Sequence, residues 1–441
     1  MTFHNTERPL ECDDHHLAEL FGTPLLVMDE PVLRHRMRRF REAFQRPGWS
    51  TSVVYAAKAL MLQAVARIAW EEGLLLDACS EGELHTALRA GVPGADCIMH
   101  GCAKTSQELA LAVESGVRHV VVDNQQEIIA LDAFARAAGK RSSVLVRVNP
   151  GIAAATKAQI QTGSVGSKFG FPIGDGQALA AVRAVCEAGG LLFGGVHCHL
   201  GSQIFDLSSY AHEIQSLAVF AADIQAALAI APRIINLGGG LGVGEADEAD
   251  GLLQRWADTV FETATQAFAA AALPRPELMI EPGRAIVAHA GSTLYRVVVG
   301  KTLADGRRAL IVDGGMSDNP RPALYEASYR VSRASRSAAA KSADGQNVEY
   351  TIFGRHCETD LLFPSVRLPE TKVGDLLRVH DTGAYTYSMA SNYNRFARPA
   401  VVLVEGTRAR LIARREPLEH LLDLDTPVQA SASHDVAVER A

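Results

Sequence analysis

Between residues 52 and 280 the chain repeats one pattern of hydrophobic and polar positions eight times. Each repeat contains a short apolar run, a polar or glycine-rich stop, and a longer segment rich in alanine, leucine and glutamate. Near-continuous apolar runs predict parallel strands that are buried on both faces, and the longer segments predict helices. The eight predicted strands are residues 52–57, 74–78, 96–99, 119–122, 143–148, 193–199, 233–237 and 277–280.

Eight strand–helix units over about 230 residues predict a closed (β/α)8 TIM-like barrel. An open, doubly wound parallel sheet is the competing fold for the same alternation. A barrel makes one further demand, because its active site is built from the loops that follow the strand C-termini. Nearly every predicted strand is followed by polar residues or glycine, among them Lys58, His199 and Glu281.

The pattern changes after Arg284, where helical periodicity almost disappears. Short strand-like runs separated by turn residues predict an all-β domain, either a β-sandwich or a partly closed β-barrel. Its predicted strands are residues 292–299, 309–313, 348–353, 376–380, 400–404 and 408–413. An early apolar run at 25–28 can join this domain as a further strand, and a helix is predicted at 30–44 with Asp29 as its N-cap. Residues 1–20 show no clear periodicity, so no element is predicted there.

The predicted domains are therefore a barrel at 31–284, a β domain at 285–424 together with 22–30, and a disordered tail at 425–441. A length of 441 residues fits two domains, and 48% hydrophobic with 21% charged residues is typical of a globular protein with a sizeable core. A net charge of −7 with mixed signs argues against nucleic acid as a partner.

The cysteines and the N-terminal segment bear on the cellular compartment. Seven scattered cysteines without a CxxC motif fit reduced thiols better than a disulfide framework. The first residues lack the pattern of a signal peptide, and no uninterrupted apolar run is long enough to span a membrane. We therefore expect a cytoplasmic protein without membrane association.

Lys58 is the first candidate for chemistry, because it directly follows a buried strand. Burial would depress its pKa and leave a neutral amine that can attack a carbonyl, although a lysine that merely caps a strand end is the simpler alternative. Gly238–Gly240 follow the seventh strand and Gly283–Arg284 the eighth, and loops at these places often bind phosphate in such barrels. With Ser202 after the sixth strand they predict an anion cradle, for which an ordinary glycine turn is the alternative.

Glu281 ends the eighth strand beside this predicted cradle, and a carboxylate buried there needs a cationic partner. Arg284 or Lys58 would make a structural ion pair, whereas a protonated heterocyclic nitrogen would indicate a cofactor. His199 offers a flat ring for stacking, but it shares a strand face with His197, so one of the two is expected to be structural. An amine, an anion cradle, a carboxylate and a stacking ring together predict a pyridoxal 5′-phosphate site in which Lys58 forms the Schiff base.

Several motifs add a family resemblance that extends over both predicted domains. The motifs are YAAKA at 55–59, SKFGF at 167–171, HCHLGSQ at 197–203, NLGGGLG at 236–242, EPGR at 281–284, GMSDNPRPALY at 315–325, HCETD at 356–360 and GAYTYSMASNYN at 383–394. In this order they resemble the alanine-racemase-fold pyridoxal-phosphate decarboxylases, and within them the diaminopimelate decarboxylases.

The resemblance implies a role for each matching residue. Lys58 would hold the cofactor, His199 would stack on its ring, and Glu281 would contact the ring nitrogen. The phosphate would be bound by Ser202, Gly239, Gly283, Arg284 and Tyr385. Cys357 would be the acid that reprotonates the α-carbon, and Glu358 would contact the distal amino group of the substrate. In the family these two residues reach into the neighbouring subunit, which implies a homodimer with shared active sites.

The substrate-binding residues implied by the resemblance are Arg284, Arg321, Tyr325, Glu358 and Tyr385. Arg321 offers a bidentate fork that suits a distal carboxylate, so the expected reaction converts meso-2,6-diaminopimelate to L-lysine and carbon dioxide. The alternatives are decarboxylation of carboxynorspermidine, lysine or ornithine, or a non-catalytic homologue that only binds pyridoxal phosphate.

The chain departs from the family pattern in two places. Residues 357–360 read Cys-Glu-Thr-Asp, one residue shorter than the usual Cys-Glu-Ser-Gly-Asp, and residues 316–320 differ from the commoner segment.

Overall fold

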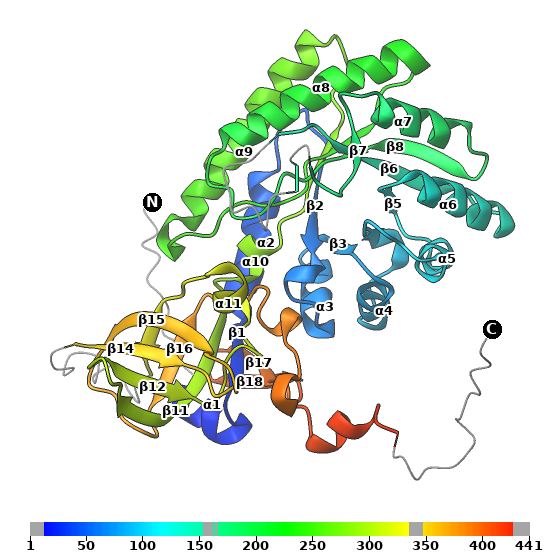
Figure 1. Ribbon diagram of the computed structural model, residues 1–441. Coiled ribbons are helices and arrows are strands. Elements are labelled where there is room, and N and C mark those ends of the chain that lie inside the picture. Colours follow the sequence, from blue (N-terminus) through cyan, green and yellow to red (C-terminus); the bar gives the residue numbers. More distant parts are fainter. Residues whose placement is uncertain (1–12, 153–161, 164–165, 335–346, 427–441) are drawn as a thin grey trace.

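The computed structural model describes residues 13–152, 162–163, 166–334 and 347–426. Figure 1 shows two lobes: a barrel wrapped by helices, and a β domain built mainly from the C-terminal part of the chain. Of the predicted disordered tail, residues 427–441 lie outside the described residues. Among the described residues, no helix combines the length and the apolar character that crossing a membrane requires.

Eight parallel strands close into a barrel, as predicted. They are β2 (Thr51–Ala56), β3 (Leu75–Ala78), β4 (Cys97–Met99), β5 (His119–Val122), β6 (Ser142–Asn149), β8 (Leu191–His197), β9 (Ile234–Asn236) and β10 (Glu277–Ile280). Each strand pairs with its neighbours in chain order, and the ring closes because β10 also pairs with β2. The open, doubly wound alternative is therefore wrong. A two-residue strand, β7 (Phe171–Pro172), pairs in parallel with the last residues of β6.

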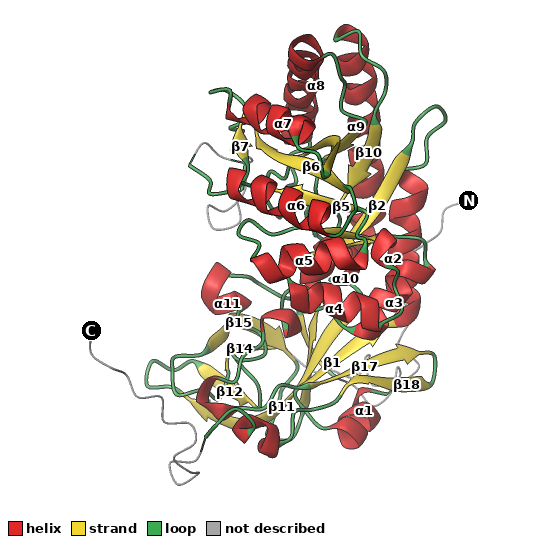
Figure 2. Ribbon diagram, turned by 90° about the vertical axis from the view of Figure 1, so that its right-hand side faces the viewer, coloured by secondary structure: helices red, strands yellow, loops and turns green. Residues whose placement is uncertain are grey.

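The helices cover the outside of the barrel (Figure 2). The main ones are α2 (Glu30–Ala43), α3 (Gln63–Glu71), α4 (Glu81–Arg89), α5 (Ser106–Ser115), α6 (Gln125–Ala137), α7 (Gln177–Glu187), α8 (Ser208–Leu228) and α9 (Ala249–Ala270). Several begin at a side-chain cap: Asp29 accepts from the backbone of Val32, and Thr105 forms a capping box with Glu108. Buried aromatic rings around Trp256 join α2, α8 and α9.

Two layers of side chains fill the barrel interior. The lower layer is apolar and consists of Val54, Ile98, Val121, Leu145, Ile234 and Met279, one from each of six strands. Successive residues of a strand alternate between its faces, so the residue two positions further along each strand also points inward. These residues are polar in most strands: Asp77, His100, Asp123, Arg147, His197, Asn236 and Glu281. A polar layer therefore lies directly above the apolar one, at the strand C-termini.

The β domain contains β1 (Leu25–Asp29), β11 (Gly291–Thr302), β12 (Arg308–Val312), β13 (Val331–Arg333), β14 (Val348–Phe353), β15 (Leu361–Leu368), β16 (Leu376–His380), β17 (Ala400–Glu405) and β18 (Arg408–Ala413). The first strand of the chain lies between β11 and β17, antiparallel to the former and parallel to the latter. The long strand β11 belongs to two parts of the sheet, because its first half pairs with β1 and β16 and its second half with β12.

The sequence analysis predicted neither strand β7 nor the short helix α10 (Arg284–Val287), and it missed four further strands and α-helices among the described residues. Helix α1 (Asp14–Phe21) lies in the segment for which no element was predicted, and its N-cap is Asp13. Strand β15 contains Pro364, a residue that is rare in central strands but tolerated here because β15 is an edge strand. Strand β13 and helix α11 (Arg321–Tyr325) are too short to show a period. All four lie in or against the β domain.

The β domain also contacts the end of β2 where the barrel opens. The backbone N–H of Tyr385 donates to the carbonyl of Ala59 at 2.8 Å, and the Ser388 hydroxyl donates to the same oxygen at 3.0 Å. These two hydrogen bonds hold the segment around Tyr385 beside Lys58, which directly precedes Ala59. This contact brings a loop of the second domain over the mouth of the barrel.

Candidate active site

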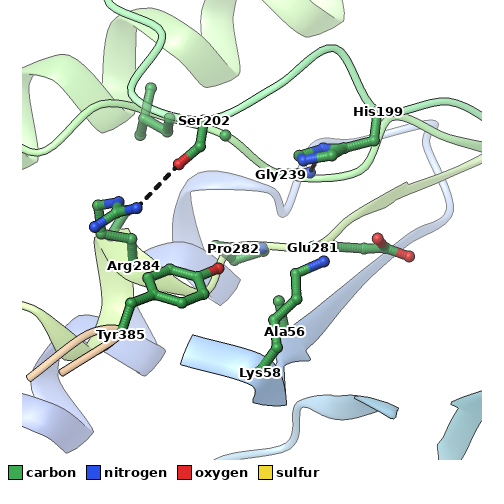
Figure 3. Close-up of a pocket in the computed structure, with 13 residues that line it drawn as sticks. Ala56, Lys58, His199, Ser202, Gly239, Glu281, Pro282, Arg284 and Tyr385 are labelled. Carbon is green, nitrogen blue, oxygen red and sulfur yellow. Dashed lines mark hydrogen bonds between the residues drawn. The ribbon is translucent and has the colours of Figure 1, made fainter. Parts of the chain in front are cut away.

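A pocket that is partly open to solvent lies at the C-terminal mouth of the barrel (Figure 3). Its lining includes all eight residues predicted to bind the cofactor: Lys58, His199, Ser202, Gly239, Glu281, Gly283, Arg284 and Tyr385. Seven of them follow four different barrel strands, and Tyr385 comes from the β domain. The candidate active-site residues of the barrel therefore lie just past the C-terminal ends of its strands, as a barrel active site requires.

Lys58 lies in a single 3-10 turn (Ala57–Ala59) after β2, with 41% of its side-chain surface exposed and Nζ 3.9 Å from Oδ2 of Asp77. The protein surroundings favour the neutral amine, but the neighbouring Cys79 and Asp77 favour the ammonium more strongly and raise the pKa of Lys58 above its ordinary value. The expected net depression of the Lys58 pKa is therefore wrong, because the neighbouring groups outweigh burial. Asp77 comes from the adjacent strand β3, and its proximity is not visible in the sequence around Lys58.

Glu281 is buried and is contacted by polar side chains from three other strands, two of which hydrogen-bond to it. Asn236 Nδ2 donates to Oε1 at 2.7 Å, His197 Nε2 lies 3.2 Å from Oε2, and His100 Nε2 lies 2.9 Å from Oε1. Burial opposes ionisation of the carboxyl, but His100 and His197 outweigh it and hold the pKa of Glu281 well below its usual range. These partners are not the arginine or lysine that a structural ion pair required, so the charge of Glu281 remains available for a bound group.

The glycines after β9 are needed because backbones approach closely there. A Cβ at Gly239 would lie 2.1 Å from the Glu281 carbonyl oxygen, and one at Gly240 would lie 2.2 Å from that of Gly201. The N–H of Gly239 donates to Nδ1 of His199 at 3.2 Å, which fixes this ring nitrogen as an acceptor. Burial, followed by the charge of Lys58, holds the pKa of His199 well below its ordinary value, so the ring is a neutral flat surface.

Two arginines lie at the other side of the pocket: the half-buried Arg284 lines it, and the buried Arg321 lies beside it. Arg284 Nη2 donates to the Ser202 hydroxyl at 3.3 Å, and its buried Nε has no hydrogen-bond partner among the described residues. The guanidinium carbons of Arg284 and Arg321 lie 4.6 and 5.6 Å from the ring centre of Tyr385. Burial, and then the charge of Arg321, lowers the pKa of Arg284. No carboxylate among the described residues pairs with either guanidinium, so this side of the pocket suits anions.

The pocket therefore fits pyridoxal 5′-phosphate. An amine, an ionised carboxylate and an anion-binding region with an unpaired arginine nitrogen surround one cavity. Arg321 and Tyr325, predicted to bind substrate, lie beside it on α11, with the Arg321 guanidinium 4.9 Å from the ring centre of Tyr325. Arg321 is buried although its helix has fewer than two turns.

Cys357 and Glu358 are not in this pocket. Both are exposed in the loop between β14 and β15, where Asn394 accepts a hydrogen bond from the Cys357 backbone at 2.9 Å and the Tyr393 hydroxyl donates to Glu358 at 2.6 Å. The structure does not bring these two residues to Lys58 of the same chain. Their place in a neighbouring subunit's site remains a prediction.

Asp360, the last residue of the shortened motif at 357–360, anchors this loop through its carboxylate. This residue adopts a left-handed backbone with φ of 41°, and its carboxylate accepts hydrogen bonds from the His356 ring at 2.6 Å and from the Met316 backbone at 2.8 Å. The loop that carries Cys357 is thus tied to the other divergent segment, residues 316–320. Both departures from the family pattern are parts of one hydrogen-bonded unit.

Three site residues received no role in the sequence analysis: Asp77, His100 and Asn236. Each lies in the polar layer, two positions beyond an inward apolar residue, and this spacing is the signal that could have found them. Asn236 also accepts from the backbone of Gly238 at 2.9 Å, so one amide joins Glu281 to the glycine loop.

Comparisons with known proteins agree with this geometry. The family described as "Pyridoxal-dependent decarboxylase, pyridoxal binding domain" matches residues 31–288. The diaminopimelate decarboxylase of Bacillus subtilis (strain 168) is 40% identical over 417 residues, which cover 94% of this chain and 94% of that protein. The one from Mycobacterium tuberculosis (strain H37Rv) is 41% identical over 428 residues, with 93% and 92% covered.

A solved structure extends the likeness to three dimensions. The crystal structure of diaminopimelate decarboxylase from M. jannaschii in complex with L-lysine superposes with a TM-score of 0.84 at 32% identity, covering 93% of this chain and 94% of that one. The identity and coverage extend over both domains and include the pocket. The chain belongs to the diaminopimelate decarboxylase family of pyridoxal-dependent decarboxylases.

Proposed function

We propose that this protein is a carboxy-lyase that decarboxylates meso-2,6-diaminopimelate to L-lysine and carbon dioxide, the last step of lysine biosynthesis, with pyridoxal 5′-phosphate as cofactor. The observation that carries the substrate assignment is a pair of arginines without a carboxylate partner among the described residues: the half-buried Arg284 in the pocket lining and the buried Arg321 beside it. Relatives named diaminopimelate decarboxylase support it. So does the relative crystallised with L-lysine.

The cofactor-binding roles follow from the lining of the pocket. Lys58 would hold the cofactor covalently through Nζ, and His199 would pack its neutral ring against the cofactor ring. The phosphate would be bound by Ser202, Gly239, Gly283, Arg284 and Tyr385. When bound, pyridoxal 5′-phosphate supplies a protonated pyridine ring that accepts the electron pair released as carbon dioxide leaves. Glu281 would keep the proton on the ring nitrogen, because its carboxylate is ionised although it is buried.

The substrate roles rest on charge and geometry. Arg321 would bind the distal carboxylate through its planar fork, and Tyr325 and Tyr385 pack against the guanidinium and limit its orientation. Lysine and ornithine have no distal carboxylate, so binding either one would leave Arg321 buried and unpaired, which costs about 1–3 kcal/mol or more for a charged group. This is why a diacid is favoured over the diamino acids.

Cys357 and Glu358 would act in the site of a second copy of the chain. Both are exposed and lie outside the pocket of their own chain, as expected of residues that complete a partner's site. In that place Cys357 would donate a proton to the α-carbon, and Glu358 would contact the distal amino group. A homodimer is therefore proposed, with a barrel domain (31–284) that holds the cofactor and a β domain (285–424 with 22–30) that supplies Arg321, Tyr385 and the Cys357 loop. A cytoplasmic location stays a prediction.

Steady-state assays of carbon dioxide release test this function. The substrates are meso-diaminopimelate, carboxynorspermidine, lysine and ornithine, and we expect kcat/KM to be highest for meso-diaminopimelate. Faster turnover of lysine or ornithine would contradict the role of Arg321, and a preference for carboxynorspermidine would identify the alternative decarboxylase. Absorbance of bound cofactor without any carbon dioxide release would identify a non-catalytic homologue. Lys58→Ala should abolish both the absorbance and turnover.

A further inference from the structure

The carboxylate of Glu281 is held from three directions by residues of the polar layer. His100, His197 and Asn236 follow or end β4, β8 and β9, and all of them are buried. The two histidine Nε2 atoms lie 2.9 and 3.2 Å from its two oxygens, and the Asn236 amide donates at 2.7 Å. Strand β4 is not a neighbour of β10 in the sheet, so the contact between His100 and Glu281 crosses the barrel interior.

The histidine on β8 is a neutral donor near pH 7. Burial lowers the pKa of His197 to about 4, although the charge of Glu281 acts in the opposite direction. A neutral N–H stabilises a carboxylate without cancelling its charge, whereas an arginine in the same place would compete with the ring nitrogen for it. Lys58, the nearest lysine, is paired with Asp77 instead. Glu281 therefore keeps a full negative charge for a cationic ligand.

We propose that His100 and His197 are positioning residues that hold Glu281 as an anion in a fixed orientation and thereby keep the ring nitrogen of the cofactor protonated. This inference rests on the proposed function, because Glu281 meets a ring nitrogen only when the pocket binds pyridoxal 5′-phosphate. Neither histidine lines the pocket, so neither touches cofactor or substrate. Their effect passes through Glu281 alone.

The same atoms could in principle hold a divalent cation. One ligand atom each from His100, His197 and Glu281 lies within 4.8 Å of the others, and two histidines with one carboxylate form a common zinc set. The Asn236 hydrogen bond to Oε1 and the histidine contacts already satisfy both carboxylate oxygens. A metal-bound carboxylate would also be unavailable to the ring nitrogen. We therefore favour the role toward the cofactor.

The test is ¹⁵N NMR of the holoenzyme loaded with ring-¹⁵N pyridoxal phosphate. His100→Leu and His197→Leu remove the Nε2 group, and we expect the ¹⁵N signal to move toward that of an unprotonated pyridine. His100→Gln and His197→Gln keep an N–H near the position of Nε2 and should restore the signal of the unaltered protein. His119→Leu is the matched control, because His119 is a buried histidine of the same barrel that contacts Ser143.

The outcomes separate this inference from the proposed function. Borohydride reduction that fixes the cofactor on Lys58, together with an unmoved ¹⁵N signal in both leucine variants, would overturn the inference and leave the function intact. No fixed cofactor in the unaltered protein would overturn the function itself.

A second measurement does not depend on the variants folding. In the unaltered holoenzyme the ¹⁵N signal should stay at the protonated position across the range in which histidine titrates, about pH 5 to 8. Other titratable or charged groups act on this cluster: Lys58 and His199 on Glu281, Arg147 on His197, and Glu83 on His100. Loss of the protonated signal within this range would contradict the inference.

Discussion

The amine of Lys58 and the carboxylate of Asp77 face each other inside the barrel, with Nζ 3.9 Å from Oδ2. Asp77 is fully buried, and this oxygen has no hydrogen-bond partner among the described residues. Asp77 is withdrawn from solvent but 41% of the Lys58 side chain is exposed, so solvent screens this interaction only in part. The carboxylate therefore favours the ammonium form of Lys58, and the amine must lose a proton before it can attack the aldehyde of the cofactor.

Removing this charge should make cofactor attachment faster near neutral pH. In Asp77→Asn the pKa of Lys58 should fall, because the raising effect of Asp77 is lost. Each unit of decrease enlarges the neutral amine fraction about tenfold at pH values below the pKa. The rate at which pyridoxal phosphate binds to the apoprotein, followed by absorbance against pH, should therefore have a lower midpoint. Asp305→Asn, at an exposed hairpin of the β domain, should leave the midpoint in place.

Glu213 should make the fold less stable as pH rises. This residue of α8 is fully buried, and burial raises its pKa to about 8, whereas an unfolded glutamate titrates near about 4.3. The folded state thus retains a proton that the unfolded chain releases. The contribution of Glu213 is fully present below the unfolded pKa and is lost progressively between about pH 4.3 and about pH 8, by a few kcal/mol. Thermal unfolding midpoints of Glu213→Gln should vary less over this range than those of the unaltered protein.

The exposed Glu262 of α9 provides the comparison for that experiment. Glu262→Gln should unfold with the same pH dependence as the unaltered chain, because its carboxylate is solvated in both states. If Glu213→Gln and the unaltered protein followed parallel curves, Glu213 would be ionised in the folded state and the proposed burial effect would be absent.

The barrel could be predicted from the sequence because each of its eight strand–helix units repeats the same local pattern of hydrophobic and polar residues. All eight strands were found within a few residues, and the motif residues Lys58, His199 and Glu281 fell at their ends. What the sequence could not supply was the set of contacts across the barrel. His100 and Glu281 are separated by 181 positions and by two intervening strands, β3 and β2. The effect of Asp77 on Lys58 reversed the expected pKa for the same reason.

Local chemistry explains the smaller misses. Pro364 hid an edge strand that has no ladder partner on one side, and α11, with five residues, is too short to show a helical period. The separation of Cys357 from the pocket also follows from three-dimensional placement alone. The sequence motifs therefore identified the reactive groups, whereas only the folded structure shows which of them lie in one pocket.

Arg321 should decide between diacid and simple diamino acid substrates. Arg321→Ala should lower kcat/KM for meso-diaminopimelate about 10- to 100-fold, the usual effect of losing hydrogen bonds to a charged group. Absorbance of the bound cofactor should be unchanged, because Arg321 does not line the cofactor pocket. Arg321→Lys should recover little activity, since an ammonium lacks the planar fork. Equal losses with Arg307→Ala, at an exposed turn, would show that the effect is not specific to the site.

Subunit mixing tests whether Cys357 completes a site in a second copy of the chain. Lys58→Ala removes the amine, and Cys357→Ala removes the proposed acid, which should slow turnover by about 10²–10⁴-fold. If the site is shared, a mixed dimer contains one pocket with both residues intact. Refolding the two variants together in equal amounts should then restore roughly a quarter of the unaltered activity, because half of the dimers are mixed and each has one working site. Activity no higher than the sum of the separate variants would place Cys357 outside the partner's pocket. Mixing Cys357→Ala with Glu358→Ala is the control: both changes lie in the same loop, so every mixed site lacks one of the two groups and no recovery is expected.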